Sequence, residues 1–358
     1  MESKPIPARY FLGANAKHGF SSLYDNFVDL EGGDFLWVIK GGPGCGKSSF
    51  MKRIGQAAEE HGEAVEYIHC SGDPDSLDGV YLPKKRTAYV DGTAPHVIEA
   101  TYPGAASLYL DIGSFFDAAA LSDDLDEIVR LNHDYKALYD RAYALIAAAT
   151  ALLPKNAGVQ FAPELQEKLE KKAMAQAGRE FRKLPKEAAV KHRFLSAVSC
   201  KGRMMLEDTL RAYEHITALD NELGLAHRYL ACLAELAQER GQDCILCHDP
   251  LEPEKLEALL LPESGSALIA VDKASALPLT PERHMRLDAL GEKLLTNEEK
   301  AVLRARRRES RILLQSAVKT LAQAKRLHDE LEQVYNPHVD FDGVFSLARD
   351  HIHWLWEA

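Results

Sequence analysis

Residues 41–48 form a glycine-rich loop whose composition suits phosphate binding. They read GGPGCGKS and match every fixed position of the pattern GxxxxGK[ST]. Glycines let the chain turn so that consecutive backbone N–H groups point at one anion, and the positive end of a following helix adds to the attraction. Lys47 would then reach the β- and γ-phosphates of a nucleoside triphosphate, and the Ser48 hydroxyl would coordinate Mg²⁺.

The residues around this loop predict the elements that must position it. The apolar run Phe35–Ile39 is typical of a buried strand, and residues 49–58 are typical of a helix. A strand, a glycine loop and a helix are the context in which this pattern binds ATP or GTP with Mg²⁺. The predicted nucleotide-binding residues are Gly41, Gly42, Pro43, Gly44, Cys45, Gly46, Lys47, Ser48 and Ser49.

A magnesium-dependent site of this kind also needs an acidic residue at the end of a neighbouring strand. Two apolar segments, residues 87–90 and 108–110, are followed by Asp91 and Asp111. We favour Asp91 because a polar turn follows it, whereas Asp111 fits a helix N-terminus equally well. We therefore predict Lys47 and Asp91 as catalytic residues, and Ser48 and Asp91 as metal ligands.

A second acidic segment follows the strand predicted at residues 64–69. Asp73, Asp75 or Asp78 could bind or deprotonate the hydroxyl of a phosphate acceptor, as in a kinase. The alternative is structural, because Asp73 before Pro74 is a typical start of a helix. We favour this capping role.

The chain repeats its own landmarks in the same order. Phe11-Leu12-Gly13-Ala14 recurs as Phe194-Leu195-Ser196-Ala197, and DPDSLD at residues 73–78 recurs as EPEKLE at residues 252–257. We expect an α/β protein of two three-layer α/β/α halves, residues 1–185 and 186–358. Long helices are expected at residues 123–153, 164–182 and 297–334.

The repeat fails at the phosphate loop. The corresponding residues 220–228 read DNELGLAHR and lack the glycine run, the lysine and the Ser/Thr. Acidic residues stand where a phosphate would bind and would repel it. The second half should therefore have the same fold without a nucleotide site.

The layout resembles a family of bacterial ATPases whose chains carry two halves of the P-loop nucleoside triphosphatase type. The resemblance rests on the phosphate loop and on residues 67–79 and 90–96, and it covers nearly the whole chain. It implies an ATPase, whose second half here is degenerate.

Composition limits the other classes of function. The net charge of −11 argues against nucleic-acid binding, and no apolar stretch is long enough to cross a membrane. The N-terminus lacks the apolar core of a signal peptide, so we expect a cytoplasmic protein with reduced thiols.

Several smaller motifs have structural interpretations. Cys244 and Cys247 match part of a haem or zinc motif, but they fall on a predicted strand, where residues three apart face opposite sides. Cys45 lies near a helix N-terminus, which could lower its pKa. The basic residues 304–308 are expected on a solvated helix face. Lys17 and Lys201 are expected in solvent, although either could reach the phosphates.

Three functions remain open from the sequence. The first is hydrolysis of ATP or GTP, and the second is transfer of the γ-phosphate to a small-molecule acceptor. The third is a nucleotide sensor that turns over slowly and signals to a protein partner.

Overall fold

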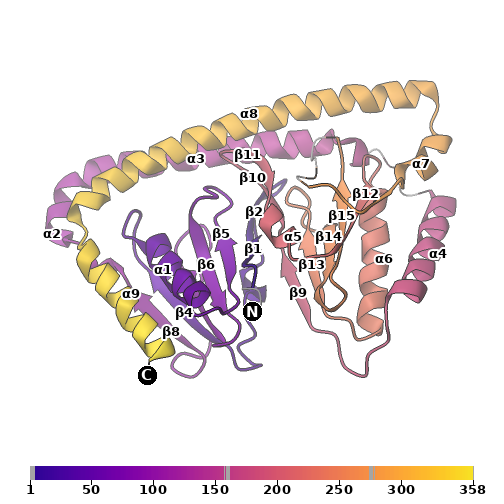
Figure 1. Cartoon of the computed structure of the whole chain (residues 1–358). Coiled ribbons are helices and arrows are strands. Elements are labelled where there is room, and N and C mark those ends of the chain that lie inside the picture. Colours follow the sequence, from indigo (N-terminus) through magenta and orange to yellow (C-terminus); the bar gives the residue numbers. More distant parts are fainter. Residues whose placement is uncertain (1–4, 157, 159–161, 274–276, 278, 358) are drawn as a thin grey trace.

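The computed structural model describes residues 5–156, 158, 162–273, 277 and 279–357. It is an α/β protein with two six-stranded sheets, one in each half (Figure 1). The first half contains β1 (Ala8–Phe11), β2 (Gly13–Ala16), β3 (Gly19–Ser22), β4 (Phe35–Lys40), α1 (Lys47–Glu60), β5 (Glu66–His69), β6 (Leu77–Leu82), β7 (Thr87–Asp91), β8 (Ser107–Asp111), α2 (Ala118–Leu121), α3 (Leu125–Ala151) and α4 (Pro163–Glu180). The second contains β9 (Val190–Arg193), β10 (Ser196–Ser199), β11 (Gly202–Met205), α5 (Glu207–Leu210), β12 (His215–Asp220), α6 (Leu225–Glu239), β13 (Cys244–His248), β14 (Leu256–Leu261), β15 (Ser266–Val271), β16 (Arg283–Met285), α7 (Asp288–Gly291), α8 (Asn297–Tyr335) and α9 (Phe341–Trp356).

The two sheets have the same strand order. The first reads β1-β5-β6-β7-β4-β8, and the second reads β9-β13-β14-β15-β12-β16. β6 and β14 run antiparallel to both of their neighbours, and the other pairs are parallel. This shared topology matches the internal repeat seen in the sequence.

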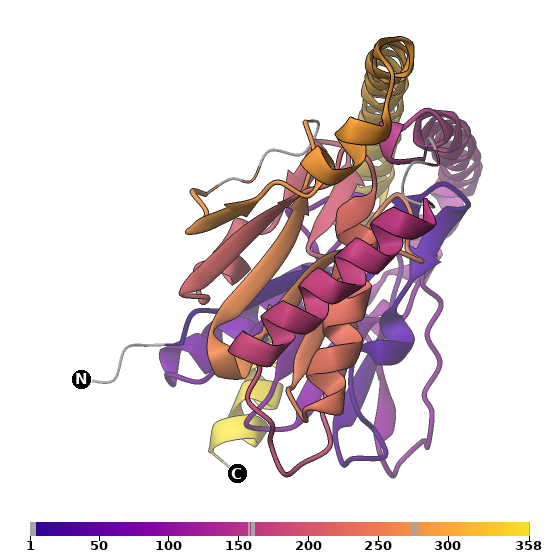
Figure 2. The ribbon, with the colours of Figure 1, turned by 90° about the vertical axis from the view of Figure 1, so that its right-hand side faces the viewer.

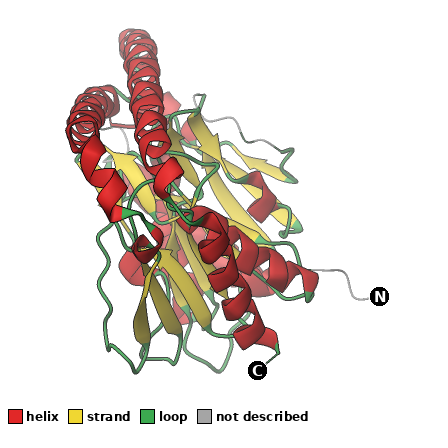
Figure 3. Ribbon diagram, turned by 90° about the vertical axis from the view of Figure 1, so that its left-hand side faces the viewer, coloured by secondary structure: helices red, strands yellow, loops and turns green. Residues whose placement is uncertain are grey.

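Two helices cover one face of each sheet. In the first half α1 and α9 pack together on the sheet through residues such as Phe50 and Val344 (Figure 3). In the second half α4 and α6 do the same through Leu169 and Leu230 (Figure 2). The opposite faces share one apolar cluster built from strands, loops and the short helix α5. The α/β/α arrangement expected for each half is therefore not observed in full. Each sheet carries one layer of helices, and the opposite faces of the two sheets share the apolar cluster.

Helices α3 and α8 cross between the halves. They lie side by side along the top of the molecule (Figure 1), so that each begins beside one sheet and ends beside the other. As a result α4, which follows α3, packs on the second half, and α9, which follows α8, packs on the first. The domain boundary near residue 185 stays a prediction. The packing does not follow this boundary, because α4 precedes it and packs on the second half, and α9 follows it and packs on the first.

Ionic contacts also join the halves. Arg193 is fully buried, and its Nε donates to Glu66 Oε1 at 2.5 Å. Lys17 forms ion pairs with Glu252 (3.3 Å) and Glu254, and Lys201 pairs with Asp75. The sequence had led us to expect both lysines in solvent. Instead, each lysine forms an ion pair with the acidic segment of the opposite half.

No helix within the described ranges combines the length and apolarity that crossing a bilayer would require.

Candidate nucleotide-binding site

The glycine loop lies between β4 and α1, as predicted. Residues 41–46 connect the strand to the helix, and Gly46 is the residue before the first helical turn. Gly44 and Gly46 have φ angles of +68° and +95°, in the left-handed region that a side chain would strain. The loop therefore takes a turn that other residue types would resist.

Lys47 and Asp91 are brought together at this loop. Lys47 Nζ donates to the carbonyl oxygens of Gly41 (3.0 Å) and Gly42 (2.8 Å), and it lies 3.6 Å from Asp91 Oδ2. The two side chains are only 12% and 14% exposed, so their attraction is weakly screened. The ammonium group is thus held at the mouth of the loop, where it can exchange carbonyl oxygens for phosphate oxygens.

Asp91 and Asp111 lie on opposite sides of β4. Asp91 ends β7 and Asp111 ends β8, and both strands pair with β4. Asp91 faces Lys47 and accepts hydrogen bonds from the backbone nitrogen (2.9 Å) and hydroxyl (2.6 Å) of Thr93. Asp111 is exposed, and the described contacts do not bring it to Lys47. The geometry therefore favours Asp91 among the two candidates.

Ser48 lies in the first turn of α1, and Ser49 beside it is exposed. Ser48 Oγ accepts a hydrogen bond from the backbone nitrogen of Leu77 (3.0 Å), at the start of β6, which holds the position of the hydroxyl oxygen. Magnesium usually takes one or two protein oxygens, with water and phosphate oxygens filling the octahedron. Ser48 and Asp91 fit this requirement. Within the described residues, no cluster of three or more His, Cys, Asp or Glu suited to a metal was found.

Cys45 is buried and differs from our expectation. Its side chain is 1% exposed, and burial raises the pKa of its thiol, although the nearby Lys47 acts in the opposite direction. The expected lowering by the helix N-terminus is therefore overcome by the loss of water around the sulfur.

The far end of α8 contacts the loop, which the sequence did not predict. A Cβ atom on Gly42 would lie 3.2 Å from the Phe116 ring and 3.5 Å from the Tyr335 ring, so both rings pack against the loop. With its amide nitrogen turned toward two carbonyl groups, Asn336 donates to the oxygens of Gly44 (3.0 Å) and Glu332 (3.1 Å). Sequence patterns did not indicate these contacts, because about 290 residues separate the two segments.

The acidic segment 73–78 forms a turn, so the predicted helix cap is wrong. Ser76 N donates to Asp73 O at 2.9 Å, which closes the turn before β6 begins. Asp73 pairs with Lys325 of α8 (3.2 Å) and Asp75 with Lys201. Two of the three carboxylates considered for acceptor binding, Asp73 and Asp75, therefore contact α8 and the second half instead.

Asp78 is the buried member of this segment. It accepts a hydrogen bond from the Tyr24 hydroxyl (2.9 Å) and lies 3.9 Å from His96 Nε2. Burial raises the pKa of the Asp78 carboxyl, the charge of Asp91 adds to this, and His96 opposes it.

The second-half loop is shorter and is closed by the protein's own side chains. Four residues, 221–224, connect β12 to α6, against six in the first half. Asp288 accepts hydrogen bonds from the backbone nitrogens of Glu222 (2.7 Å) and Leu223 (3.0 Å), so a carboxylate takes the place of a bound anion. Burial raises the pKa of the Asp288 carboxyl to about 6.

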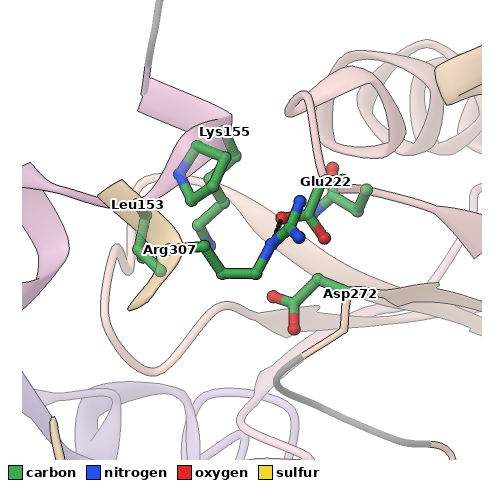
Figure 4. Close-up of a pocket in the computed structure, with 7 residues that line it drawn as sticks. Leu153, Lys155, Glu222, Asp272 and Arg307 are labelled. Carbon is green, nitrogen blue, oxygen red and sulfur yellow. Dashed lines mark hydrogen bonds and ion pairs between the residues drawn. The ribbon is translucent and has the colours of Figure 1, made fainter. Parts of the chain in front are cut away.

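Long side chains from α8 and from the turn that follows α3, residues 154–156, fill the space above this loop. Arg307 pairs with Glu222 (Figure 4), and Lys155, which is 2% exposed, pairs with Asp249. The cavity that remains is about 10 Å³, about the space that one water molecule needs. The basic residues 304–308 thus include one that binds the degenerate loop, which corrects the expectation of a solvated face.

Asp272 does not match Asp91 in register. Asp91 pairs with Ile39 of β4, whereas the counterpart of Ile39, Leu219, pairs with Ala270. Asp272 lies two residues further on and contacts Arg203 at 3.3 Å. The acidic residue that follows β15 is therefore two residues away from the position that Asp91 occupies in the first half.

Cys244 and Cys247 lie on β13, as predicted, and their side chains belong to different apolar clusters. The two sulfurs therefore face opposite sides of the sheet and cannot share a zinc ion or a haem.

Comparisons with models of protein families, with curated proteins and with solved structures found no match to this chain.

Proposed function

We propose that the first half binds a nucleoside triphosphate with Mg²⁺ and hydrolyses it, as a member of the P-loop type. The observation that carries this proposal is the position of Lys47, at the start of α1 and 3.6 Å from Asp91, beside a loop of left-handed glycines. A fixed cation and oriented backbone N–H groups stabilise the charge that develops on a transferring phosphoryl group.

The residues have separate roles in this proposal. The loop N–H groups and Lys47 hold the phosphates, while Ser48 and Asp91 would hold Mg²⁺, which neutralises charge on the phosphate oxygens. Water attacks the γ-phosphorus and the bond to the bridging oxygen breaks, which releases the diphosphate and inorganic phosphate. The second-half loop, residues 221–224, does not bind a phosphate in this proposal, since Asp288 closes it.

The test is calorimetry of MgATP and MgGTP binding together with phosphate release. Lys47→Met should weaken binding or turnover by about 100-fold or more. Lys52→Met is the matched control, because Lys52 is an exposed lysine of the same helix, and it should behave as the wild type. The proposal fails if the wild-type chain binds neither nucleotide, or if Lys47→Met binds and hydrolyses normally.

The contact of α8 with Gly44 supports a second candidate, a nucleotide sensor with slow turnover. In that case the loop would bind the nucleotide and α8 would transmit its state to a protein partner. Tight binding with negligible phosphate release would favour the sensor over the hydrolase.

A further inference from the structure

A surface cavity of about 420 Å³ lies beside the phosphate loop. Residues 114–117, which follow β8, form one wall, and residues 337–340, which follow α8, form the other. Two backbone hydrogen bonds join the walls: Asp117 N donates to His338 O (2.8 Å), and Asp340 N donates to Phe115 O (2.9 Å). The cavity is therefore built by both halves of the chain.

The cavity shares a side chain with the phosphate loop. Phe116 lines the cavity, and its ring packs on Gly42. The strand order β7-β4-β8 places Asp91 on one side of the loop and this cavity on the other. A triphosphate whose γ-phosphate lies at Lys47 and Asp91 can therefore extend its opposite end toward the cavity.

The walls combine aromatic and acidic groups. Phe115 and Phe116 line the cavity and are only half-buried, so each leaves some aromatic surface that a flat ring can contact. Asp117 and Asp340 each use Oδ1 to cap a helix, through Ala120 N (3.1 Å) and Gly343 N (2.9 Å). The capping bonds leave Oδ2 of each carboxylate for donors such as ribose hydroxyls or base N–H groups. The volume lies within the usual range of about 300–1,000 Å³ for small-molecule sites.

We propose that this cavity binds the nucleoside, base and ribose together, of the triphosphate whose phosphates the loop holds. The inference rests on the proposed function, because it needs nucleotide binding at residues 41–48. It adds that residues 337–340, from the second half, complete the nucleotide site.

The first experiment separates the nucleoside from the phosphates. Calorimetry compares MgATP with magnesium tripolyphosphate, which has the phosphate chain and no nucleoside. We expect MgATP to bind at least about tenfold more tightly. Equal affinities would overturn the inference and leave phosphate binding intact, whereas binding of neither ligand would overturn the proposed function and the inference with it.

The second experiment fills the cavity. Ser114 and Ser122 are both exposed, and each hydroxyl donates to the carbonyl three residues earlier (2.8 and 2.7 Å), but only Ser114 lines the cavity. Ser114→Trp should weaken MgATP binding by at least about tenfold and leave tripolyphosphate binding unchanged. Ser122→Trp should change neither. Normal MgATP binding by Ser114→Trp would contradict the inference.

The third experiment uses the unmodified chain and does not depend on the folding of a variant. Photolabelling with 2-azido-ATP, followed by mass spectrometry, should place the label on residues 114–117 or 337–340 and should be suppressed by excess ATP. A label placed elsewhere and suppressed by ATP would overturn the inference.

Discussion

The side-chain amide of Asn336 donates to the carbonyl oxygen of Gly44, at 3.0 Å. This bond fixes the outer side of the phosphate loop to the last turn of α8, a helix whose first turns lie on the second half. A carbonyl held outward leaves the neighbouring N–H groups to face the bound anion. The loop is therefore supported by a segment that no local motif includes.

Loss of this support should weaken nucleotide binding. Asn336→Ala removes the hydrogen bonds to Glu332 and to Gly44. Loss of the Gly44 bond, about 1 kcal/mol, should reduce MgATP affinity by about fivefold in calorimetry. Gln333→Ala is the control, since Gln333 is an exposed residue of the same helical turn. Equal losses in both variants would show that the effect belongs to the helix and not to the Gly44 contact.

Asp91 and Asp111 should differ as metal ligands. Asp91→Asn should lower phosphate release by about 100-fold, because the site loses a carboxylate that faces Lys47. Nucleotide binding without magnesium should persist in this variant. Asp111→Asn should retain full activity, because Asp111 is exposed on the other side of β4. The opposite pattern would assign the metal to β8.

Asp288 should make stability depend on pH. Its folded pKa of about 6 lies above the usual value of 3.8 for an aspartate, so the folded chain takes up this proton at a higher pH than the unfolded chain. The contribution of protonated Asp288 to the free energy of unfolding is complete below pH about 4 and is lost as the pH rises through about 6. Urea unfolding of wild type and Asp288→Asn should show the wild type gaining up to about 3 kcal/mol, relative to the variant, between pH 8 and pH 4.

The control for this measurement is Glu292→Gln, which changes an exposed carboxylate close to Asp288 in sequence. The difference in the free energy of unfolding between Glu292→Gln and the wild type should be the same at pH 8 and at pH 4. A difference between wild type and Asp288→Asn that does not change with pH would contradict the account of Asp288.

Cys45 should resist thiol reagents. It is buried and its thiol pKa is raised, so it should react more slowly in the native protein at pH 7.5 than the half-buried Cys232. Mass spectrometry after brief labelling measures both sites, and labelling in denaturant should make them equal. Rapid native labelling of Cys45 that ATP suppresses would support instead the lowered thiol pKa that the sequence suggested.

Local elements could be predicted well from the sequence. The segment Thr87–Asp91 is a strand as predicted, and the helix predicted at residues 297–334 is observed at Asn297–Tyr335. Apolar periodicity and turn residues act over short distances, so they carry this information. Asp73 before Pro74 was misinterpreted, because the same pair also suits a turn.

Contacts between distant segments could not be predicted. No sequence pattern around Asn336 indicates that it supports the glycine loop. Likewise, no pattern around Asp288 indicates that it closes the corresponding loop of the second half. Both result from the path of α8 and of the residues before it, which tertiary packing determines. The crossing of α3 and α8 is for this reason the least predictable part of the candidate site.

This crossing bears on how the duplicated chain can change. If the gene were split between the repeats, each product would carry away the helix that covers the other's sheet, α4 in one case and α9 in the other. Neither copy can be discarded without exposing the apolar face of its sister. The second repeat, which has no glycine loop of its own, would then be retained for the apolar face that it covers, and its loop 221–224 would be free to vary as long as that packing is kept.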